Sequence, residues 1–383
     1  MKTFWGTPNR IEEPLLGKVT KKAFAFGNQK TFFVSEELLW GIGHGAYVTS
    51  GRNIPRILRG KPSLTEISSE SLMRLHEGDI IKIFPNGRIS IVWEKGSRHN
   101  VIFVTDKCDC RCIMCPQPPD SNSPLSLWKE NKEILLMLDD KTSSICFSGG
   151  EPTLEMEQLV DLLALCKIRF PNADLAILTN GVALSDFDKV KQLVEQRNEF
   201  LIFCVSLDGD TDDIHDEIVG VEGAFSQTMR GLYNLARFRC PVELRFVIMR
   251  QNFERLPYYA EFVYRNLPFV SHIAFMGLEF TGEAARNLES IKIDPVEYAD
   301  SLREAVFHLH RREMNVSIYN VPKCLLPRDV WRFARDSISP WKKGYLDICA
   351  TCEEKKNCCG VFETSTYTSQ NLKPIIKGCR DGK

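Results

Sequence analysis

The feature that most constrains the fold is an alternation of apolar, β-rich runs with amphipathic segments, which extends from Asn100 to about Tyr319. Such alternation predicts βα units built around a parallel sheet. The strand candidates are VIFVT, SICFS, DLAILTN, LIFCVSL, VELRFVIM and HIAFMGLEF. The sequence therefore predicts an α/β fold with six parallel strands.

Two regions of different character flank this core. Residues 1–97 contain short alternating runs, in which Asn86-Gly87 is a strong hairpin signal, and they predict a small β-rich N-terminal domain. Residues 98–319 hold the α/β core. Residues 320–383 are loop-rich and contain six of the fourteen cysteines, so we expect a cysteine-rich, metal-binding extension.

Composition narrows the class of function. The 383-residue chain has a formal net charge of -1, which gives no electrostatic case for nucleic acid or a membrane surface as a partner. No apolar run is long enough for a membrane span, and the first residues lack the apolar core of an export signal. Fourteen cysteines then indicate metal or redox chemistry in a reducing compartment, and we expect a cytoplasmic protein.

Three cysteines follow the first predicted strand. Cys108, Cys112 and Cys115 lie in VTDKCDCRCIMCPQPP with the spacing C-x3-C-x2-C. Three thiolates can hold a four-iron cluster and leave one iron without a protein ligand. An open coordination position is typical of catalytic metal sites. Cys110 lies between these residues, and we interpret it as a thiol that binds no metal.

Four motifs in this order resemble those of the radical S-adenosylmethionine (SAM) superfamily. They are the cysteine motif, SICFSGGEPT, ILTNG and FCVSLDG, each at the end of a predicted strand. The resemblance implies a partial (β/α)6 TIM-like barrel that binds a [4Fe-4S] cluster and SAM. It also implies that an electron from the cluster cleaves SAM to a 5′-deoxyadenosyl radical, which abstracts hydrogen from a substrate.

The resemblance places the SAM contacts at the carboxyl ends of the strands, where barrel enzymes build their sites. The implied contacts are Met114, Ser148, Gly149, Gly150, Glu151, Thr179, Asn180, Ser206 and Asp208. Glu151 is expected near the amino group of SAM. A tight turn is the alternative for Ser206 and Asp208, because such residues dominate turns. No catalytic acid or base is assigned.

A second cysteine group occurs in YLDICATCEEKKNCCGVF, where Cys349, Cys352 and Cys358 have the spacing C-x2-C-x5-C. The group resembles part of the SPASM or twitch extensions of peptide-modifying radical SAM enzymes, which implies one auxiliary [4Fe-4S] cluster. Zinc is the alternative metal. We expect Cys324 as the fourth ligand, with Cys359 and Cys379 as alternatives. Phe362 occupies the position of a further SPASM cysteine, which argues against a second auxiliary cluster.

Several segments, among them IMCPQPP, GLEFTGEAARN and YNVPKCLLP, resemble the radical SAM maturases of the His-Xaa-Ser peptide system. This resemblance implies post-translational modification of a ribosomally synthesised peptide. It also implies a second radical SAM maturase as partner and an electron donor such as flavodoxin or ferredoxin. The alternatives are a radical SAM enzyme for a small molecule or RNA, and a non-catalytic Fe–S scaffold or redox sensor.

Two further residues are left without a role. His215 follows the SLDG turn, where it would contact substrate or be an ordinary core or surface histidine. Arg245 lies in the fifth predicted strand and could reach the carboxylate of SAM, but the segment does not reveal the direction of its side chain, so it is not assigned to the site. The other cysteines of the core, Cys146, Cys166, Cys204 and Cys240, are expected to be small buried hydrophobic residues.

Overall fold

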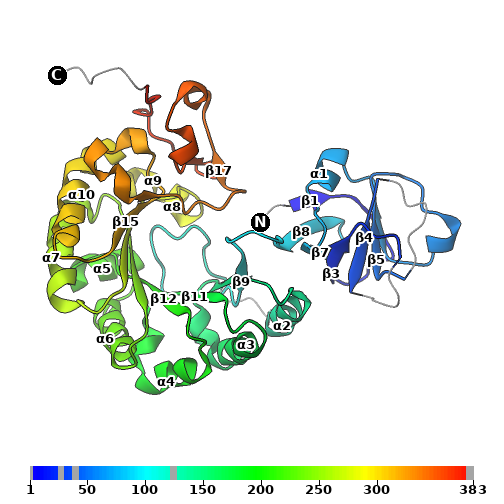
Figure 1. Ribbon diagram of the computed structural model, residues 1–383, viewed down its shortest axis with the longest axis horizontal. Helices are drawn as coiled ribbons and strands as arrows, with labels where there is room; N and C mark the ends of the chain where they lie inside the picture. Colours follow the sequence, from blue (N-terminus) through cyan, green and yellow to red (C-terminus); the bar gives the residue numbers. More distant parts are fainter. Residues whose placement is uncertain (1–2, 25–29, 37–42, 121–126, 377–383) are drawn as a thin grey trace. The chain divides into compact units, whose positions relative to one another are not determined.

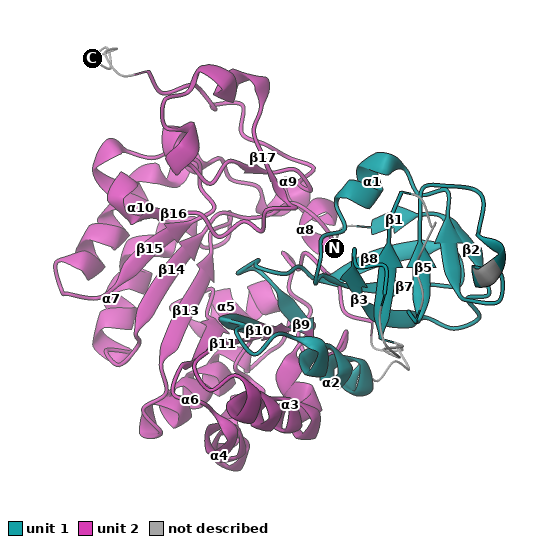
Figure 2. Ribbon diagram, turned by 45° about the vertical axis from the view of Figure 1, so that its right-hand side comes forward, with its two compact units in different colours: residues 1–102, 127–145 teal, residues 103–126, 146–383 magenta. Residues whose placement is uncertain are grey.

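The computed structural model describes residues 3–24, 30–36, 43–120 and 127–376. The chain forms two compact units, shown in Figure 2. Unit 1 comprises residues 1–102 and 127–145, and unit 2 comprises residues 103–126 and 146–383. The predicted three-part division, with boundaries after residues 97 and 319, stays a prediction of domain organisation.

Unit 1 is built on a mixed sheet in the order β1-β8-β7-β3-β4-β5-β6-β2. The predicted hairpin is present, because β7 and β8 pair antiparallel around a turn in which Gly87 has φ +86°. The elements are β1 (Thr3–Trp5), β2 (Thr7–Asn9), β3 (Leu15–Thr20), β4 (Thr31–Val34), β5 (Ala46–Val48), β6 (Ser63–Thr65), α1 (Ser69–Met73), β7 (Ile80–Ile83), β8 (Arg88–Trp93) and α2 (Trp128–Met137).

The two edge strands of this sheet, β1 and β2, follow each other directly in the chain. β1 pairs with β8 and β2 pairs with β6, and only Gly6 separates β1 from β2. The Gly6 N–H donates to the carbonyl of Gly87 at 3.0 Å. A Cβ at Gly6 would lie 2.7 Å from the carbonyl oxygen of Thr65, so only glycine fits where the strand crosses from one partner to the other. The sheet thus closes on itself around an apolar core.

Unit 2 contains most of the α/β core, since β9 and β10 begin within the bounds of unit 1. Its sheet has the order β16-β15-β14-β13-β12-β11-β10-β9, and each neighbouring pair from β11 to β16 is parallel. The strands are β9 (Val101–Phe103), β10 (Ser144–Ser148), β11 (Asp174–Thr179), β12 (Leu201–Ser206), β13 (Val242–Val247), β14 (His272–Met276), β15 (Val316–Tyr319) and β16 (Ala334–Arg335). The α/β fold is confirmed, and two short strands extend the predicted six.

Figure 1 shows the larger helices of unit 2 on the outer side of this curved sheet. One face of β13 is buried against them: Phe246 lies 4.4 Å from Tyr259 of α7 between ring centroids. The helices are α3 (Met156–Arg169), α4 (Phe187–Gln196), α5 (Asp212–Val219), α6 (Ala224–Arg237), α7 (Leu256–Asn266), α8 (Glu283–Arg286), α9 (Leu288–Ile291) and α10 (Pro295–His310).

The segment after β15 is mostly irregular. It contains the antiparallel pair of β17 (Lys343–Gly344) and β18 (Val361–Phe362), together with short 3-10 turns at Lys323–Leu325, Asp347–Thr351 and Lys355–Asn357. With so little regular structure, this segment depends on side-chain contacts or on bound groups for its order.

Candidate functional site

The loop that carries Cys108, Cys112 and Cys115 is held by backbone hydrogen bonds to two helices. Before it, the chain leaves β9 beside β10, where the Val104 N–H donates to Ser148 at 2.7 Å. The Ile113 N–H donates to the Ile218 carbonyl in α5 at 3.0 Å, and the Glu283 N–H, at the start of α8, donates to the Cys115 carbonyl at 2.8 Å. The three thiols are therefore presented by a fixed loop.

Gly149 and Gly150 pack against the start of that loop. The Gly150 N–H donates to the Thr105 carbonyl at 2.7 Å. A Cβ would lie 2.2 Å from the Thr105 oxygen at Gly149 and 2.1 Å from the Lys107 oxygen at Gly150. Glycine is required at both positions because backbone meets backbone there.

One cavity of about 160 Å³ in unit 2 is lined by every residue that the sequence assigned to the first cluster or to SAM. These residues come from the cysteine loop and from the carboxyl ends of β10, β11 and β12. They are Cys108, Cys112, Met114, Cys115, Ser148, Gly149, Gly150, Glu151, Thr179, Asn180, Ser206 and Asp208. The structure brings these residues together, and their binding roles remain predictions.

Glu151 ties three parts of this cavity to one another. Its side chain is 1% exposed, and its carboxylate accepts four hydrogen bonds. Oε1 accepts from the Thr153 N–H at 3.0 Å, the Thr153 hydroxyl at 2.5 Å and the Thr179 hydroxyl at 2.8 Å, and Oε2 accepts from the Asn180 N–H at 2.7 Å. Burial raises the pKa of Glu151, and the four donors oppose that shift.

Asp208 has one satisfied and one unsatisfied oxygen. Oδ1 accepts from the Val247 N–H at 2.8 Å, whereas Oδ2 is buried without a hydrogen-bond partner among the described residues. Burial raises the pKa of Asp208 to about 7. The Asp208 N–H donates to Nδ1 of His215 at 3.1 Å, and burial lowers the pKa of His215 to about 4. A neutral His215 with its proton on Nε2 fits this contact.

Cys110 lines the same cavity. Its thiol is 2% exposed and accepts a hydrogen bond from Nδ2 of Asn180 at 3.3 Å. Burial raises the pKa of Cys112 and of Cys115, whereas the hydrogen bond with Cys110 lowers the pKa of Cys108. The assignment of Cys110 as a thiol that binds no metal stays a prediction.

The donor set fits an Fe–S cluster with a small polar ligand beside it. Three thiols of one fixed loop line the cavity, and the partnerless Oδ2 of Asp208 belongs to another residue that lines it. Within the described part of the chain, no three His, Cys, Asp or Glu side chains converge on a single metal ion. A cubane makes a different demand, because each of its cysteines binds a different iron atom.

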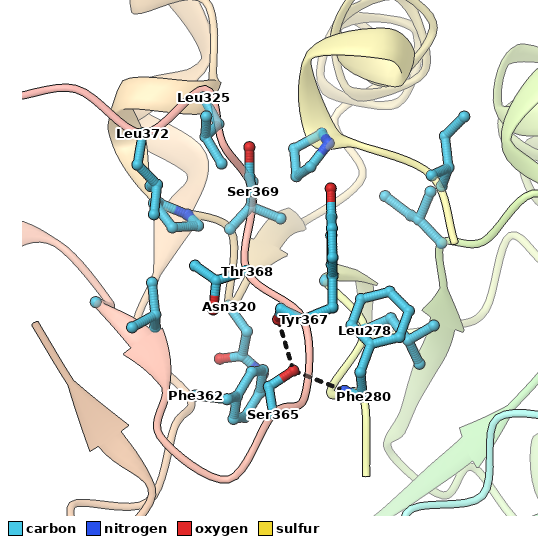
Figure 3. Close-up of a pocket in the computed structure, with 18 of the residues that line it drawn as sticks. Leu278, Phe280, Asn320, Leu325, Phe362, Ser365, Tyr367, Thr368, Ser369 and Leu372 are labelled. Carbon is cyan, nitrogen blue, oxygen red and sulfur yellow. Dashed lines mark hydrogen bonds between the residues drawn. The ribbon is translucent and has the colours of Figure 1, made fainter. Parts of the chain in front are cut away.

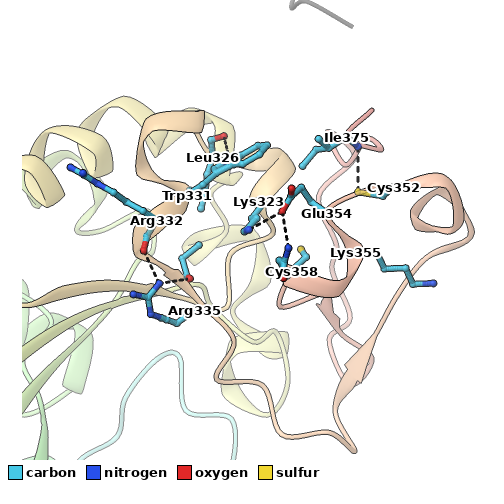
Figure 4. Close-up of polar contacts among 12 residues, drawn as sticks. Lys323, Leu326, Trp331, Arg332, Arg335, Cys352, Glu354, Lys355, Cys358 and Ile375 are labelled. Atoms are coloured by element: carbon cyan, nitrogen blue, oxygen red, sulfur yellow. Dashed lines mark hydrogen bonds and ion pairs between the residues drawn. The ribbon is translucent and has the colours of Figure 1, made fainter. Parts of the chain in front are cut away.

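The second cysteine group also converges. A smaller cavity in the C-terminal segment is lined by Cys324, Cys349, Cys352 and Cys358, together with Tyr345. Figure 4 shows part of this region: Cys352 Sγ accepts from the Ile375 N–H at 3.3 Å, and Lys323 pairs with Glu354 at 3.0 Å. The hydrogen bond with Cys359 lowers the pKa of Cys358 to about 6. Of the alternative ligands, Cys359 is buried outside this cavity and Cys379 lies outside the described residues.

A third, largely apolar cavity of about 70 Å³ adjoins the second one, and Figure 3 shows its walls. One wall comes from the carboxyl ends of β13, β14 and β15 and the other from the C-terminal segment. Ser365 joins the walls, because its hydroxyl accepts from the Phe280 N–H at 3.0 Å and donates to the Tyr367 carbonyl at 2.9 Å. Phe280 and Tyr367 meet edge to face at 5.2 Å.

Several residues of the site escaped sequence reasoning. The first cavity is also lined by Gln117 and Val219, and by His215, for which contact with substrate stays one of two predictions. Asn287, between α8 and α9, supports the cysteine loop, because its side chain donates to the Ile113 carbonyl at 3.0 Å. Contacts of this kind join segments that are far apart in the sequence, and no local pattern marks them.

Residues 102–263 match the family model described as Radical SAM superfamily. Fe-coproporphyrin III synthase of Methanosarcina barkeri is 30% identical over 225 residues, which cover 57% of this chain and 54% of that protein. Pre-heme d1 synthase of Dinoroseobacter shibae is 35% identical over 160 residues, which cover 40% and 37%. The subtilosin biosynthesis protein AlbA of Bacillus subtilis is 21% identical over 191 residues, which cover 45% and 42%.

Among solved structures, SuiB of Streptococcus suis bound to SAM is 19% identical with a TM-score of 0.45, covering 57% of this chain and 49% of SuiB. A second, anSMEcpe with bound SAM, is 18% identical with a TM-score of 0.45, covering 57% and 60%. This chain spans about half the length, or less, of the curated relatives quoted above. In the residues that the structure describes, no helix is both long and apolar enough to span a bilayer.

Proposed function

We propose that this chain, whose residues 102–263 match the family model of the radical SAM superfamily, is a maturase that modifies a ribosomally synthesised peptide. The observation that carries the proposal is the single cavity lined by three cysteines of one loop and by all nine of the implied SAM contacts. The superfamily uses a [4Fe-4S] cluster and SAM, and these residues fit both groups.

Each part of the cavity has a task in this proposal. A [4Fe-4S] cluster bound there would supply the electron for the reductive cleavage of SAM. Cys108, Cys112 and Cys115 would hold the cluster, and the unpartnered Oδ2 of Asp208 would accept a hydrogen bond from SAM. Glu151 fixes Asn180 and Thr179 against the glycine turn. The surrounding strands exclude water and stray C–H bonds from the reactive carbon.

The second cysteine group is proposed to hold an auxiliary [4Fe-4S] cluster. Cys324, Cys349, Cys352 and Cys358 line one cavity, which would give every iron of a cubane a protein ligand. A closed site of this kind suits electron transfer more than substrate binding. We propose that the adjoining apolar cavity beside Phe280 and Tyr367 accepts part of the substrate.

The peptide substrate is proposed to be of the His-Xaa-Ser type, with a second radical SAM maturase as partner, a flavodoxin or ferredoxin as electron donor, and the cytoplasm as location. The motif resemblance supports this, and so does the similarity to AlbA, a bacteriocin biosynthesis protein. A specific observation favours a second candidate, a carboxylate-bearing small molecule. Higher identities are seen with Fe-coproporphyrin III synthase and pre-heme d1 synthase.

Anaerobic reconstitution with iron, sulfide, SAM and reductant tests the chemistry. We expect 5′-deoxyadenosine from the wild-type chain and none when Cys108, Cys112 and Cys115 are replaced together by alanine. Cys166→Ala is the matched control, because Cys166 is buried in α3 away from both cysteine cavities. A wild-type chain that binds iron but forms no 5′-deoxyadenosine would favour a scaffold or redox sensor.

The substrate is tested separately, by mass analysis after turnover with a His-Xaa-Ser peptide or with coproporphyrin III. A mass change on the peptide alone supports the maturase. A change on the tetrapyrrole alone replaces it with the second candidate.

A further inference from the structure

A polar cluster on the sheet of unit 2 has no part in the function proposed above. Along β13, the residues that pack towards α7 are buried, and the alternate residues, Glu243 and Arg245, are half-buried. Since Phe246 faces Tyr259 of α7, Glu243 and Arg245 face the opposite side of the sheet. Solvent reaches that side, because their side chains are 12% and 20% exposed.

Glu243 is fully engaged within this cluster. Oε1 accepts from Nε of Arg245 at 3.1 Å, and Oε2 accepts from the Tyr319 hydroxyl at 3.1 Å and from Nδ1 of His272 at 2.9 Å. Because a carboxylate only accepts, His272 carries a proton on Nδ1, and its Nε2 meets the Ser317 hydroxyl at 2.9 Å. Side chains from β13, β14 and β15 thus hold Glu243 in place. Glu243 in turn holds the Nε edge of the Arg245 guanidinium.

The other edge of the Arg245 guanidinium is open. Within the described residues, its Nη atoms make no hydrogen bond or ion pair, whereas Arg255 in the same unit pairs with Asp210 through both Nε and Nη2. Arg245 also interacts electrostatically with Cys146 and Cys204, whose thiol pKa values are raised by burial to about 12. Those thiols are neutral and leave its charge uncompensated on that side.

The position of Arg245 relates it to the SAM cavity. In the parallel register of β12 and β13, Arg245 pairs with Ser206, which lines that cavity. An arginine whose Nε is held by a carboxylate presents two parallel N–H groups in a fixed fork that matches a carboxylate. The fork is already oriented, so little conformational entropy is lost when it binds.

We propose that Arg245 binds a carboxylate group of the substrate, with Glu243, His272 and Tyr319 as positioning residues. The inference rests on the proposed function in one respect, namely that the substrate lies inside the sheet beside SAM. The carboxylate has two sources that share this chemistry, an acidic side chain of a peptide and a propionate of a tetrapyrrole.

Binding to the reconstituted, SAM-loaded chain tests the proposal without turnover. One probe pair is the acetylated and amidated peptide Gly-His-Glu-Ser-Gly and its Gln analogue, followed by calorimetry. The other pair is coproporphyrin III and its tetramethyl ester, followed by absorbance. In at least one pair, we expect the wild-type chain to bind the carboxylate form about 10- to 100-fold more tightly than the neutral form.

Substitutions assign that preference to Arg245. Arg245→Gln should abolish it, and Arg245→Lys, which keeps the charge but loses the fork, should reduce it. Arg265→Gln is the matched control, because Arg265 also pairs with a glutamate through Nε but lies exposed on α7. Thermal melting checks folding, and if Arg245→Gln does not fold, the comparison of Arg245→Lys with wild type decides.

Three results would overturn the proposal. They are a wild-type chain that prefers neither carboxylate probe, a preference that survives in both Arg245 variants, and a loss of SAM affinity that equals or exceeds the loss of probe affinity. The last result would assign Arg245 to the cofactor. Failure of the proposed function is recognised separately, as an absence of 5′-deoxyadenosine from a chain that still discriminates the probes.

Discussion

Asp208 lies in the turn after β12 and His215 lies in the following helix α5, and their contact makes a pH-dependent contribution to stability. Burial lowers the pKa of His215 from 6.5 to about 4, so the unfolded state binds more protons between these values. The contribution of His215 to folding stability therefore falls as the pH drops through this window. His215→Gln keeps an acceptor for the Asp208 N–H but removes the titration.

We therefore expect the stability difference between wild type and His215→Gln to shift by about 2 kcal/mol in favour of the variant between pH 7 and pH 5. Guanidinium unfolding of the metal-free chain at both pH values measures it. Asp208 is present in both proteins, so the pH-dependent contribution of its own titration largely cancels in the stability difference. A difference that does not change with pH would mean that folding leaves the pKa of His215 unshifted.

Glu151 offers a second test at the residue scale. In Glu151→Gln, an amide N–H₂ must face donors that now point at a carboxylate, so we expect a loss of about 1–3 kcal/mol of stability together with weaker SAM binding. Glu155→Gln is the control, because Glu155 makes a partly exposed ion pair with Lys107 that is worth at most about 1 kcal/mol. Equal losses in the two variants would contradict the central role of Glu151.

The sequence could place single residues only through motifs. The four motifs named twelve residues, and all of them line one cavity, since each motif ends a parallel strand. Arg245 was left without a direction, because VELRFVIM alternates apolar and charged residues without showing which face meets helices. The burial of Phe246 against Tyr259 supplies that answer, and it comes from α7, a later element.

At the scale of elements, the packing of the turn after β10 against the cysteine loop makes a steric prediction. In Gly150→Ala, the new Cβ would lie 2.1 Å from the Lys107 oxygen, so the loop must move. We expect about 1–3 kcal/mol of destabilisation and less iron bound after reconstitution. Gly60→Ala is the control, since nothing lies within 4 Å of a Cβ there. Normal iron content in Gly150→Ala would show that the loop position does not govern cluster binding.

Periodicity identified the six strands from β9 to β14 but not the remainder of the sheet. β15 and β16 are short, and their pairing depends on neighbours that are distant in the sequence. Helix α2 reads as part of the α/β alternation, yet its contacts assign it to unit 1, where Glu130 pairs with Lys82. Amphipathic spacing reveals that a helix has an apolar face, and it does not reveal which surface covers that face.

At the scale of the whole molecule, two separate cysteine cavities predict two metal centres that can be lost independently. Replacing Cys324, Cys349, Cys352 and Cys358 together by alanine would remove every proposed ligand of the second centre, and none of these residues lines the first cavity. We expect the iron content to fall from about eight to about four atoms per chain, with SAM binding retained. Iron analysis and equilibrium SAM binding on the reconstituted variant measure both effects. Unchanged iron would show that these four cysteines hold no cluster, and four atoms in the wild-type chain would argue for zinc or an empty second site.

The break at Gly6 between β1 and β2 has a consequence for how unit 1 could recognise a peptide. β1 and β2 form the two opposite edges of the same sheet. Each of them offers at most three residues of backbone with which an added strand could pair. Recognition by strand addition needs a longer row of unsatisfied amides and carbonyls. A leader sequence that docks on unit 1 would therefore be read through side chains and loops, and scrambling its order while keeping its β-propensity should abolish binding.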